Sequence, residues 1–182
     1  MAVQAILYTN IAIFALSLFL NPKGMTLSMN PFMFLTPDLR SLLLMGATGT
    51  IPIDRFGRWW TLLSANYLHA GLLHIVFNMM ALNQLWQLVA REFGVARTFT
   101  IYMAGGVAGF YLSYLVRVPV TIGASAAVCG LMGAALYYGK SRGGIYGQII
   151  YRQISGWVIG LFIFGFVVSG INNWGHAGGI LA

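Results

Sequence analysis

The chain has 182 residues, of which 59% are hydrophobic and only 7% are charged, and its mean hydropathy is +0.80. Soluble domains carry about 25% charged residues, so the composition excludes an ordinary water-soluble globule. The net charge of +7 does not indicate nucleic-acid binding, because the basic residues lie mostly between apolar runs and not in one stripe.

The first uncharged run predicts a membrane span over residues 3–20, since a spanning helix needs about 20 mostly apolar residues. The following segment, 21–68, is expected to be a long external loop, and long loops are often functional. Within it, TPDLRSLLLMG predicts a short helix that Thr36 caps, with Pro37 at its first position and Asp38 favourable to its dipole.

Later uncharged runs predict further spans. They are expected at residues 72–90, 98–116, 124–139 and 154–168, with a sixth beginning at 176–182. The sixth is too short to cross a bilayer, so we expect it to be the start of a truncated helix. The predicted fold is all-α: a single polytopic membrane domain over residues 1–182, built as a six-helix bundle, because backbone polar groups in lipid must be satisfied internally.

Small residues recur at four-residue spacing in the later spans, which lets helix backbones approach closely in membranes. The pairs are Gly105 and Gly109, Ala126 and Gly130, Gly156 and Gly160, and Gly175 and Gly179. We therefore expect tight helix crossings at these pairs.

Basic residues in the short connections predict the orientation of the bundle. With the N-terminus in the cytoplasm, the cytoplasmic connections hold five basic residues and the short outer connections hold only Arg117. The five are Arg91, Arg97, Lys140, Arg142 and Arg152. Positive charge favours the cytoplasmic side, so we expect a multi-pass integral protein of the cell (inner) membrane with a cytoplasmic N-terminus.

A small set of polar residues falls at the predicted outer ends of spans. His74 and Asn78 are four residues apart and so share one helix face, and His69 lies a little over one turn earlier. Ser125 opens the fourth predicted span and His176 opens the sixth. Because the second, fourth and sixth spans run in the same direction, these residues are expected at one depth.

This set has the components of nucleophilic catalysis. Serine is a weak nucleophile unless a base removes its proton, and His176 is a base of suitable type. His74, the Asn78 amide and the Ser125 backbone N–H could donate hydrogen bonds to the oxyanion of an acyl transfer. No buried carboxylate is expected to orient His176, so a Ser–His dyad is more economical than a triad.

On these residues the chain resembles a rhomboid intramembrane serine protease. GASA around Ser125 resembles the family's GxSG-like nucleophile motif, and GHAGG contains a histidine that opens the sixth span. His69, His74 and Asn78 match the family's HxxxxHxxxN pattern at the second span. The resemblance covers the whole six-span layout and implies hydrolysis of peptide bonds in or near transmembrane segments of membrane proteins.

The resemblance also implies individual roles. Ser125 would be the nucleophile and His176 the general base, and the oxyanion hole would comprise His74, Asn78 and the Ser125 N–H. The active site would open to the outer side of the membrane. The fifth span, with the GINNWG sequence that follows it, would act as the substrate gate.

Supporting residues and partners follow from the same resemblance. His69 would be structural and hold the outer loop, and Gly123 and Ala126 would support the nucleophile. The loop that contains GRWWTLL would lie partly in the outer leaflet. Single-span membrane proteins would be the substrates and the lipid bilayer the surrounding partner, with no cofactor, metal or nucleic acid.

Three positions depart from the family's pattern. Ala126 replaces the usual glycine after the nucleophile. The family's Trp–Arg pair in the outer loop appears as Trp60-Thr61, with Arg58 nearby in reversed order. Cys129 stands where a tyrosine often packs against the catalytic histidine.

Other interpretations stay open at this point. A serine in a membrane helix more often bonds neighbouring helices, His69 and His74 alone could fix a loop, and His176 alone could cap carbonyls. One alternative function is that of a non-catalytic rhomboid-like protein that binds membrane helices. Another is a metal- or proton-handling membrane protein, since three histidines at one depth could bind Zn²⁺.

The orientation can be tested by cysteine accessibility, because Cys129 is the only native cysteine. In a background without it, Arg142→Cys should react with a membrane-impermeant maleimide only after the cells are permeabilised. Arg117→Cys is the matched control and should react in intact cells. Labelling of Arg142→Cys from outside intact cells would contradict the orientation and the shared depth of the polar residues.

Overall fold

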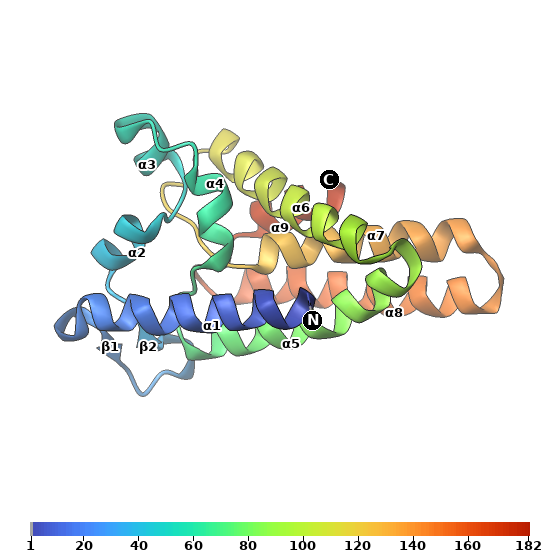
Figure 1. Ribbon diagram of the computed structural model, residues 1–182, viewed down its shortest axis with the longest axis horizontal. Coiled ribbons are helices and arrows are strands. Elements are labelled where there is room, and N and C mark those ends of the chain that lie inside the picture. The colour runs from blue at the N-terminus through green and yellow to red at the C-terminus, as the bar shows by residue number, and fades with distance from the viewer. Residues whose placement is uncertain (1) are drawn as a thin grey trace.

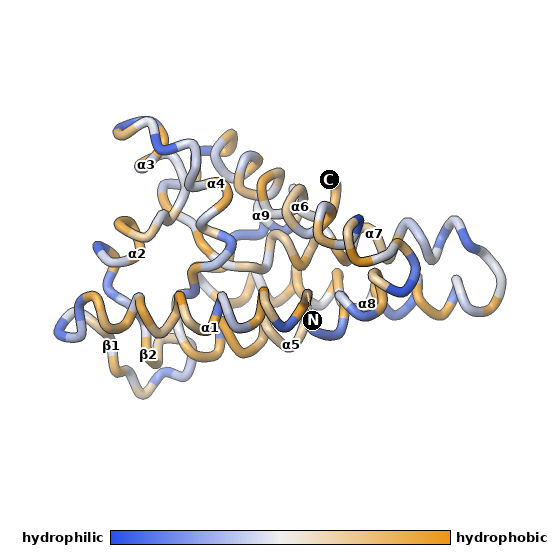
Figure 2. The backbone as a smooth tube through the Cα atoms, viewed as in Figure 1, coloured by the Kyte–Doolittle hydropathy of each residue, from blue (hydrophilic) through white to orange (hydrophobic). Residues whose placement is uncertain are grey.

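The computed structural model describes residues 2–182, apart from the side chain of Phe32, and is mostly helical. Among these residues, three helices are long and apolar enough to cross a membrane by length and composition. They are α1 (Ala2–Leu20), α5 (Leu72–Phe93) and α8 (Gly144–Val167). Hydrophobic residues dominate the long helices, and hydrophilic residues gather at turns and helix ends (Figure 2).

Three further helices complete the main body. They are α6 (Val95–Leu115), α7 (Ser125–Arg142) and α9 (Asn173–Leu181). Helix α7 contacts α5, α6, α8 and α9, so it is the central element of the fold. The α7–α8 hairpin extends beyond the other helices at one end (Figure 1).

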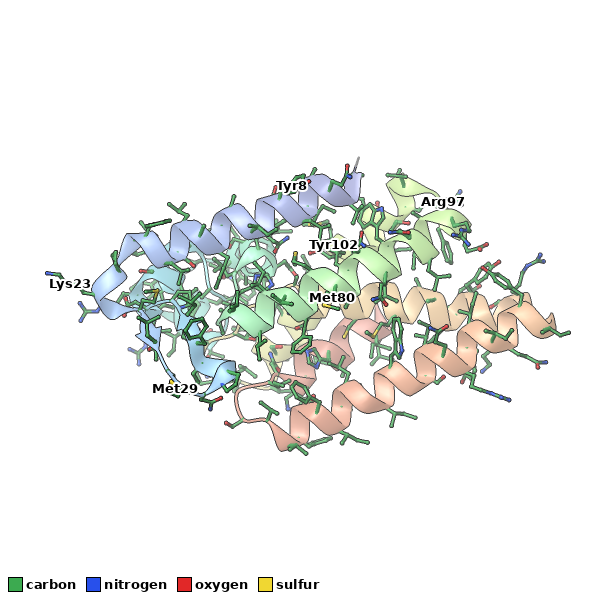
Figure 3. All side chains as sticks on the ribbon, turned by 90° about the horizontal axis from the view of Figure 1, so that it is seen from below. Tyr8, Lys23, Met29, Met80, Arg97 and Tyr102 are labelled. Carbon is green, nitrogen blue, oxygen red and sulfur yellow. The ribbon has the colours of Figure 1, made fainter. Side chains whose placement is uncertain are left out.

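One core of buried side chains joins five of these helices. It includes Ile6 from α1, Leu82 from α5, Tyr102 from α6, Leu131 from α7 and Ile154 from α8. Figure 3 shows Tyr102 between α1 and α5. Because lipid is as apolar as these side chains, close packing rather than the hydrophobic effect holds such helices together in a membrane.

The segment between α1 and α5, expected as a long loop, is folded into short elements. They are η1 (Pro22–Gly24), β1 (Thr26–Leu27), η2 (Pro31–Met33), β2 (Phe34–Thr36), α2 (Leu39–Met45), α3 (Thr50–Phe56), α4 (Thr61–Ser64) and η3 (Ala65–Tyr67). Strands β1 and β2 are antiparallel, and the short helices lie beside the C-terminal ends of α1 and α6 (Figure 1).

The short helix predicted from TPDLRSLLLMG is α2, but its cap differs from the prediction. Asp38 is the N-cap, and its Oδ2 accepts hydrogen bonds from the backbone N–H groups of Arg40 (3.0 Å) and Ser41 (3.4 Å). Thr36 lies in β2, and its hydroxyl donates to the Met33 carbonyl. The prediction of a Thr36 cap was wrong, because aspartate caps as well as threonine and also carries the charge that the helix dipole favours.

Three of the later helices begin earlier than the apolar runs indicate. Helix α8 begins at Gly144, ten residues before the expected start at 154, and α6 and α9 each begin three residues early, at Val95 and Asn173. Arg152, which is exposed, bounds the apolar run from which the start of α8 is predicted. A charged residue ends an apolar run but does not interrupt backbone hydrogen bonding, so the helix continues through it.

Small residues bring α6, α7 and α9 into backbone contact. A Cβ atom added to Gly105 of α6 would lie 2.7 Å from the Cα of Gly130 on α7. Gly109 of α6 meets the Gly175 carbonyl, and Gly179 of α9 meets the Ala126 carbonyl. Three of the four predicted small-residue pairs are therefore confirmed as close crossings.

The fourth pair behaves differently. A Cβ atom added to Gly156 or Gly160 of α8 would meet nothing within 4 Å in the described chain. The prediction of a tight crossing at this pair was wrong, because the face of α8 that carries these glycines does not pack against another described helix.

The contrast between these glycines gives a stability test. Gly105→Ala should lower stability by about 1–3 kcal/mol, because the new methyl group would overlap the backbone of α7. Gly160→Ala is the matched control and should leave stability unchanged or slightly raised, since alanine favours a helix more than glycine does. Thermal unfolding of both variants in the same detergent measures the difference. Equal melting temperatures would contradict the close α6–α7 contact.

Candidate active site

Ser125 is the first residue of α7, and the loop before it is hydrogen-bonded to the segment between α1 and α5. The backbone N–H of Thr121 donates to the Thr48 carbonyl (2.7 Å), and the Thr48 N–H donates back to Thr121 (3.1 Å). The Gly123 N–H donates to the Ala65 carbonyl (2.9 Å). These hydrogen bonds fix the position of the loop, and therefore the position of Ser125 at the start of α7.

Ser125 and His176 are joined directly. Ser125 Oγ and His176 Nε2 are 3.1 Å apart, although the two residues are 51 positions apart in the sequence. His176 is buried and Ser125 is half-buried. The contact depends on α9 lying against α6 and α7 at their small residues, which brings the His176 ring to the N-terminus of α7.

None of the three carboxylates of the chain takes part in this contact. Asp38 caps α2, Asp54 accepts from Tyr114 and pairs with Arg117, and Glu92 accepts from Tyr146. No side chain among residues 2–182 hydrogen-bonds to His176 Nδ1. The arrangement in the described chain is therefore a pair and not a Ser–His–carboxylate triad.

His74 borders the same space through Gly123. A Cβ atom on Gly123 would lie 2.8 Å from His74 Nε2 and 3.6 Å from Ser125 Oγ. Gly123 also has a φ of +126°, which side-chain-bearing residues rarely adopt. Glycine is required here both by backbone conformation and by the approach of the His74 ring.

A backbone hydrogen bond fixes which nitrogen of His74 carries the proton. The Ala70 N–H donates to His74 Nδ1 (3.1 Å), so in the neutral ring Nε2 bears the hydrogen. This donor is on the side of the ring that faces Gly123. His74 can therefore offer an N–H, and not a lone pair, to a group bound beside Ser125.

Asn78 lies one turn further along α5. Its Nδ2 donates to the His74 carbonyl (2.8 Å), and no hydrogen bond links it to Ser125 or His176 in the part of the chain that the structure describes. One amide hydrogen is thus engaged, and the second is available to another acceptor.

His69 supports the His74 ring. It is fully buried, and its ring lies edge-on to that of His74 with the centroids 5.1 Å apart. Burial, and secondly the neighbouring His74, lower the pKa of His69 well below its usual 6.5. His69 is therefore neutral near pH 7 and acts as a packing group against His74.

The structure explains two of the departures from the family pattern. Ala126 is buried, and its Cβ and carbonyl face Gly109 and Gly179 respectively. Cys129 lies against Gly179, about one turn beyond His176 on α9. Both side chains are small where α9 makes its closest approach to α7.

The third departure, Trp60-Thr61 with Arg58 nearby, lies in the segment between α1 and α5. Arg58 Nη1 donates to the Leu43 carbonyl (3.2 Å), and its guanidinium lies 5.2 Å from the centre of the Phe56 ring. The Trp60 ring borders Gly46. These residues tie α2 to the start of α4 and do not contact Ser125 in the described structure.

Two further groups, which the motifs in the sequence do not include, are connected with this site in the structure. One is the Ala70 N–H, which fixes the His74 tautomer. The other is Asn172, the N-cap of α9, whose side chain accepts from the Gly175 N–H (3.1 Å). An asparagine three residues before a glycine and four before His176 was the available signal for a helix cap.

The metal-binding interpretation receives no support from the geometry. Within residues 2–182, no group of three or more His, Cys, Asp or Glu side chains is arranged to hold a metal ion. His69, His74 and His176 instead contact a ring, a backbone N–H and a hydroxyl.

Comparison with known proteins identifies relatives. The family profile described as the Rhomboid domain matches residues 56–182. Rhomboid protease GluP of Bacillus subtilis is 38% identical over 125 residues, which cover 69% of this chain and 25% of GluP. RHOMBOID-like protein 1 of Arabidopsis thaliana is 30% identical over 193 residues, covering 97% of this chain and half of that protein.

A further relative, the putative rhomboid protease YdcA of Bacillus subtilis, is 31% identical over 68% of this chain and 63% of its own length. The chain thus spans between a quarter and about two thirds of these relatives. The profile covers more than half of the chain, and the matched part contains Ser125 and His176 together with His69, His74 and Asn78. On this evidence the chain belongs to the rhomboid family of integral membrane proteins.

Proposed function

We propose that this chain is an intramembrane serine endopeptidase that hydrolyses peptide bonds in or near transmembrane segments, using Ser125 and His176 as a dyad. The observation that carries the proposal is the 3.1 Å contact between Ser125 Oγ and His176 Nε2. Polar side chains are costly to bury in a membrane protein without a partner. The Ser125 hydroxyl lies beside a ring nitrogen of His176 that can accept its proton. This is the arrangement expected of a nucleophile and its general base.

In the acylation step, Ser125 Oγ attacks the carbonyl carbon of the scissile bond while its proton passes to His176 Nε2. The carbonyl oxygen becomes an oxyanion. Its hydrogen-bond donors are His74 Nε2–H, the free N–H of the Asn78 amide and the Ser125 backbone N–H at the start of α7.

The same groups complete the reaction. The tetrahedral intermediate collapses, the C–N bond breaks, and the leaving amine takes the proton from His176. Water then attacks the acyl carbon while His176 accepts its proton; the C–O bond to Ser125 breaks, His176 returns the proton to Ser125 Oγ, and the carboxylic acid product is released. His176 thus accepts one proton and gives one up in each half of the reaction, so no further acid or base is required.

The architecture that we propose around this site has six membrane helices. Helices α1, α5, α6, α7, α8 and α9 are the six. The N-terminus lies in the cytoplasm, and the Ser125–His176 pair opens to the outer side. Support comes from the basic residues in the short connections and from the first turns of α5, α7 and α9, which bring His74, Ser125 and His176 together.

Single-span membrane proteins are the proposed substrates. In a regular helix the scissile carbonyl and N–H are hydrogen-bonded within the backbone, so a substrate must unwind before Ser125 can reach the carbonyl carbon. Segments with helix-breaking residues near the cleavage site unwind most easily. The C-terminal half of α8, which has no buried residue beyond Ile154, is the proposed gate for their entry.

Removal of either dyad residue should abolish cleavage. Ser125→Ala and His176→Ala are each expected to lower turnover of a single-span substrate in liposomes to background, because neither the nucleophile nor its base can be replaced by a neighbour. A fluorophosphonate probe should label the native protein and not Ser125→Ala.

Ser17→Ala is the matched control for the serine substitution. Ser17 is also buried, but its hydroxyl only donates to the Phe14 carbonyl of its own helix. This variant should retain native activity. Substantial cleavage by Ser125→Ala, with the probe attached elsewhere, would refute the assignment, and a folded native protein that neither cleaves nor reacts would favour the non-catalytic helix-binding alternative.

The proposed oxyanion donors should act on kcat rather than on KM. The charge that they meet exists only in the transition state, so His74→Ala should lower kcat by about 10²–10³, the range for loss of one donor in a soluble serine protease. Asn78→Ala should have a smaller effect, since His74 and the Ser125 N–H remain.

His69→Ala provides the comparison for this experiment. Its ring packs against His74 without offering a proposed donor, so the variant should mainly lower the melting temperature. Kinetic constants for one substrate and melting curves should be measured for each protein. An effect of His74→Ala on KM alone, or loss of kcat in a stable His69→Ala protein, would contradict this division of roles.

A further inference from the structure

Asn172 joins three segments of the chain through one side chain. Its Oδ1 accepts a hydrogen bond from the Gly175 N–H in the first turn of α9 (3.1 Å). Its Nδ2 donates to Ser113 Oγ on α6 (2.7 Å) and to Thr121 Oγ1 in the loop before α7 (3.0 Å). These contacts use the acceptor of the amide and both of its donor hydrogens.

The partners fix the orientation of this amide. Ser113 Oγ uses its own hydrogen to donate to the Gly109 carbonyl (2.8 Å), so it presents a lone pair to Asn172. The Gly175 backbone nitrogen can only donate. An amide turned by 180° would place its NH₂ against the Gly175 N–H, and two donors would face each other.

Two of the three partners lead along the chain to the Ser125–His176 pair. Gly175 immediately precedes His176 in α9. Thr121 lies four residues before Ser125, and its backbone is itself bonded to Thr48 in the outer segment. Asn172 therefore connects the helix that carries the imidazole with the loop that delivers the hydroxyl.

We propose that Asn172 is a positioning residue that sets the distance and alignment between Ser125 Oγ and His176 Nε2, an inference that rests on the proposed function. No carboxylate in the described chain orients the His176 ring. The ring takes its position from its helix, and the two hydrogen bonds from Asn172 Nδ2 tie the start of that helix to Ser113 on α6 and to Thr121 in the loop before α7.

Helix capping alone does not account for this side chain. A cap needs only an oxygen that accepts from the first turn, and serine, threonine or aspartate supplies one. The two Nδ2 hydrogen bonds leave α9 altogether and reach different elements. Their loss would let α9 shift against the loop, and a displacement of about 1 Å in a catalytic pair can cost roughly 100-fold in rate.

The test separates capping from positioning. Asn172→Ser keeps a capping oxygen but is too short to reach Ser113 and Thr121. The double variant Ser113→Ala/Thr121→Val removes both acceptors and leaves the cap in place. For each, kcat and the rate of Ser125 labelling by a fluorophosphonate should fall about 10-fold or more, with KM changed less than about twofold.

Thr98→Val is the matched control, measured at the same temperature well below every melting point. Thr98 is a buried threonine of α6 whose hydroxyl donates to the Gly94 carbonyl at the other end of the helix (2.8 Å). This variant should keep the native kcat and labelling rate. Asn172→Ser added to the double variant should cause little further loss, because both changes break the same hydrogen bonds.

The outcomes distinguish this inference from the proposed function. If the native protein is not labelled at Ser125, the proposed function fails and the role of Asn172 fails with it. If the native protein is labelled at Ser125 but Asn172→Ser keeps the native kcat and labelling rate, or changes only the melting temperature, the positioning role is wrong and the proposed function stands.

Discussion

The close approach of α6, α7 and α9 is the constraint on which the rest of the structure depends. Gly105 and Gly130 bring α6 against α7, and Gly179 brings α9 against Ala126. Side chains at these positions would separate the helices, and the His176 ring would leave the start of α7. In lipid, where apolar surface gains nothing by leaving its surroundings, this backbone contact is the main source of association between the helices.

The hydrogen bonds of the polar groups around the start of α7 depend on this contact. With the helices close together, Ser125 meets His176, Ser113 meets Asn172, and the loop before α7 pairs with the outer segment at Thr48. Each of these side chains and the loop then have at least one hydrogen-bond partner within the protein, which offsets the cost of polar groups in a bilayer. The segment between α1 and α5 is part of this network, since it supplies a backbone acceptor at Ala65 and a backbone donor at Ala70.

Sequence reasoning reached the family, the mostly helical fold and the approximate helix positions, because apolar runs and a joint Ser–His–His–Asn spacing are local features. It could not find what depends on three-dimensional contact. Gly156 and Gly160 have the same spacing as Gly105 and Gly109, and only packing reveals that one pair is exposed. The Thr36 and Asp38 caps were equally plausible by residue type, and the Asn172 contacts join residues 51 and 59 positions apart. The roles of individual site residues stay predictions.

Helix α8 is held unevenly along its length. Its buried residues, Gly147, Ile150 and Ile154, all belong to the half that pairs with α7 in the projecting hairpin, and the half that leads to α9 has none (Figure 1). The half beyond Ile154 is held more weakly, by the partly buried Trp157, Val158 and Leu161 and by a hydrogen bond from Asn173 Nδ2 to the Phe162 carbonyl (3.4 Å). Thermal motion is therefore expected to be larger towards Val167 than in the half that pairs with α7. The fold thus separates a compliant element from a rigid one, so that lateral movement beside the site need not disturb the spacing of the hydroxyl and the imidazole.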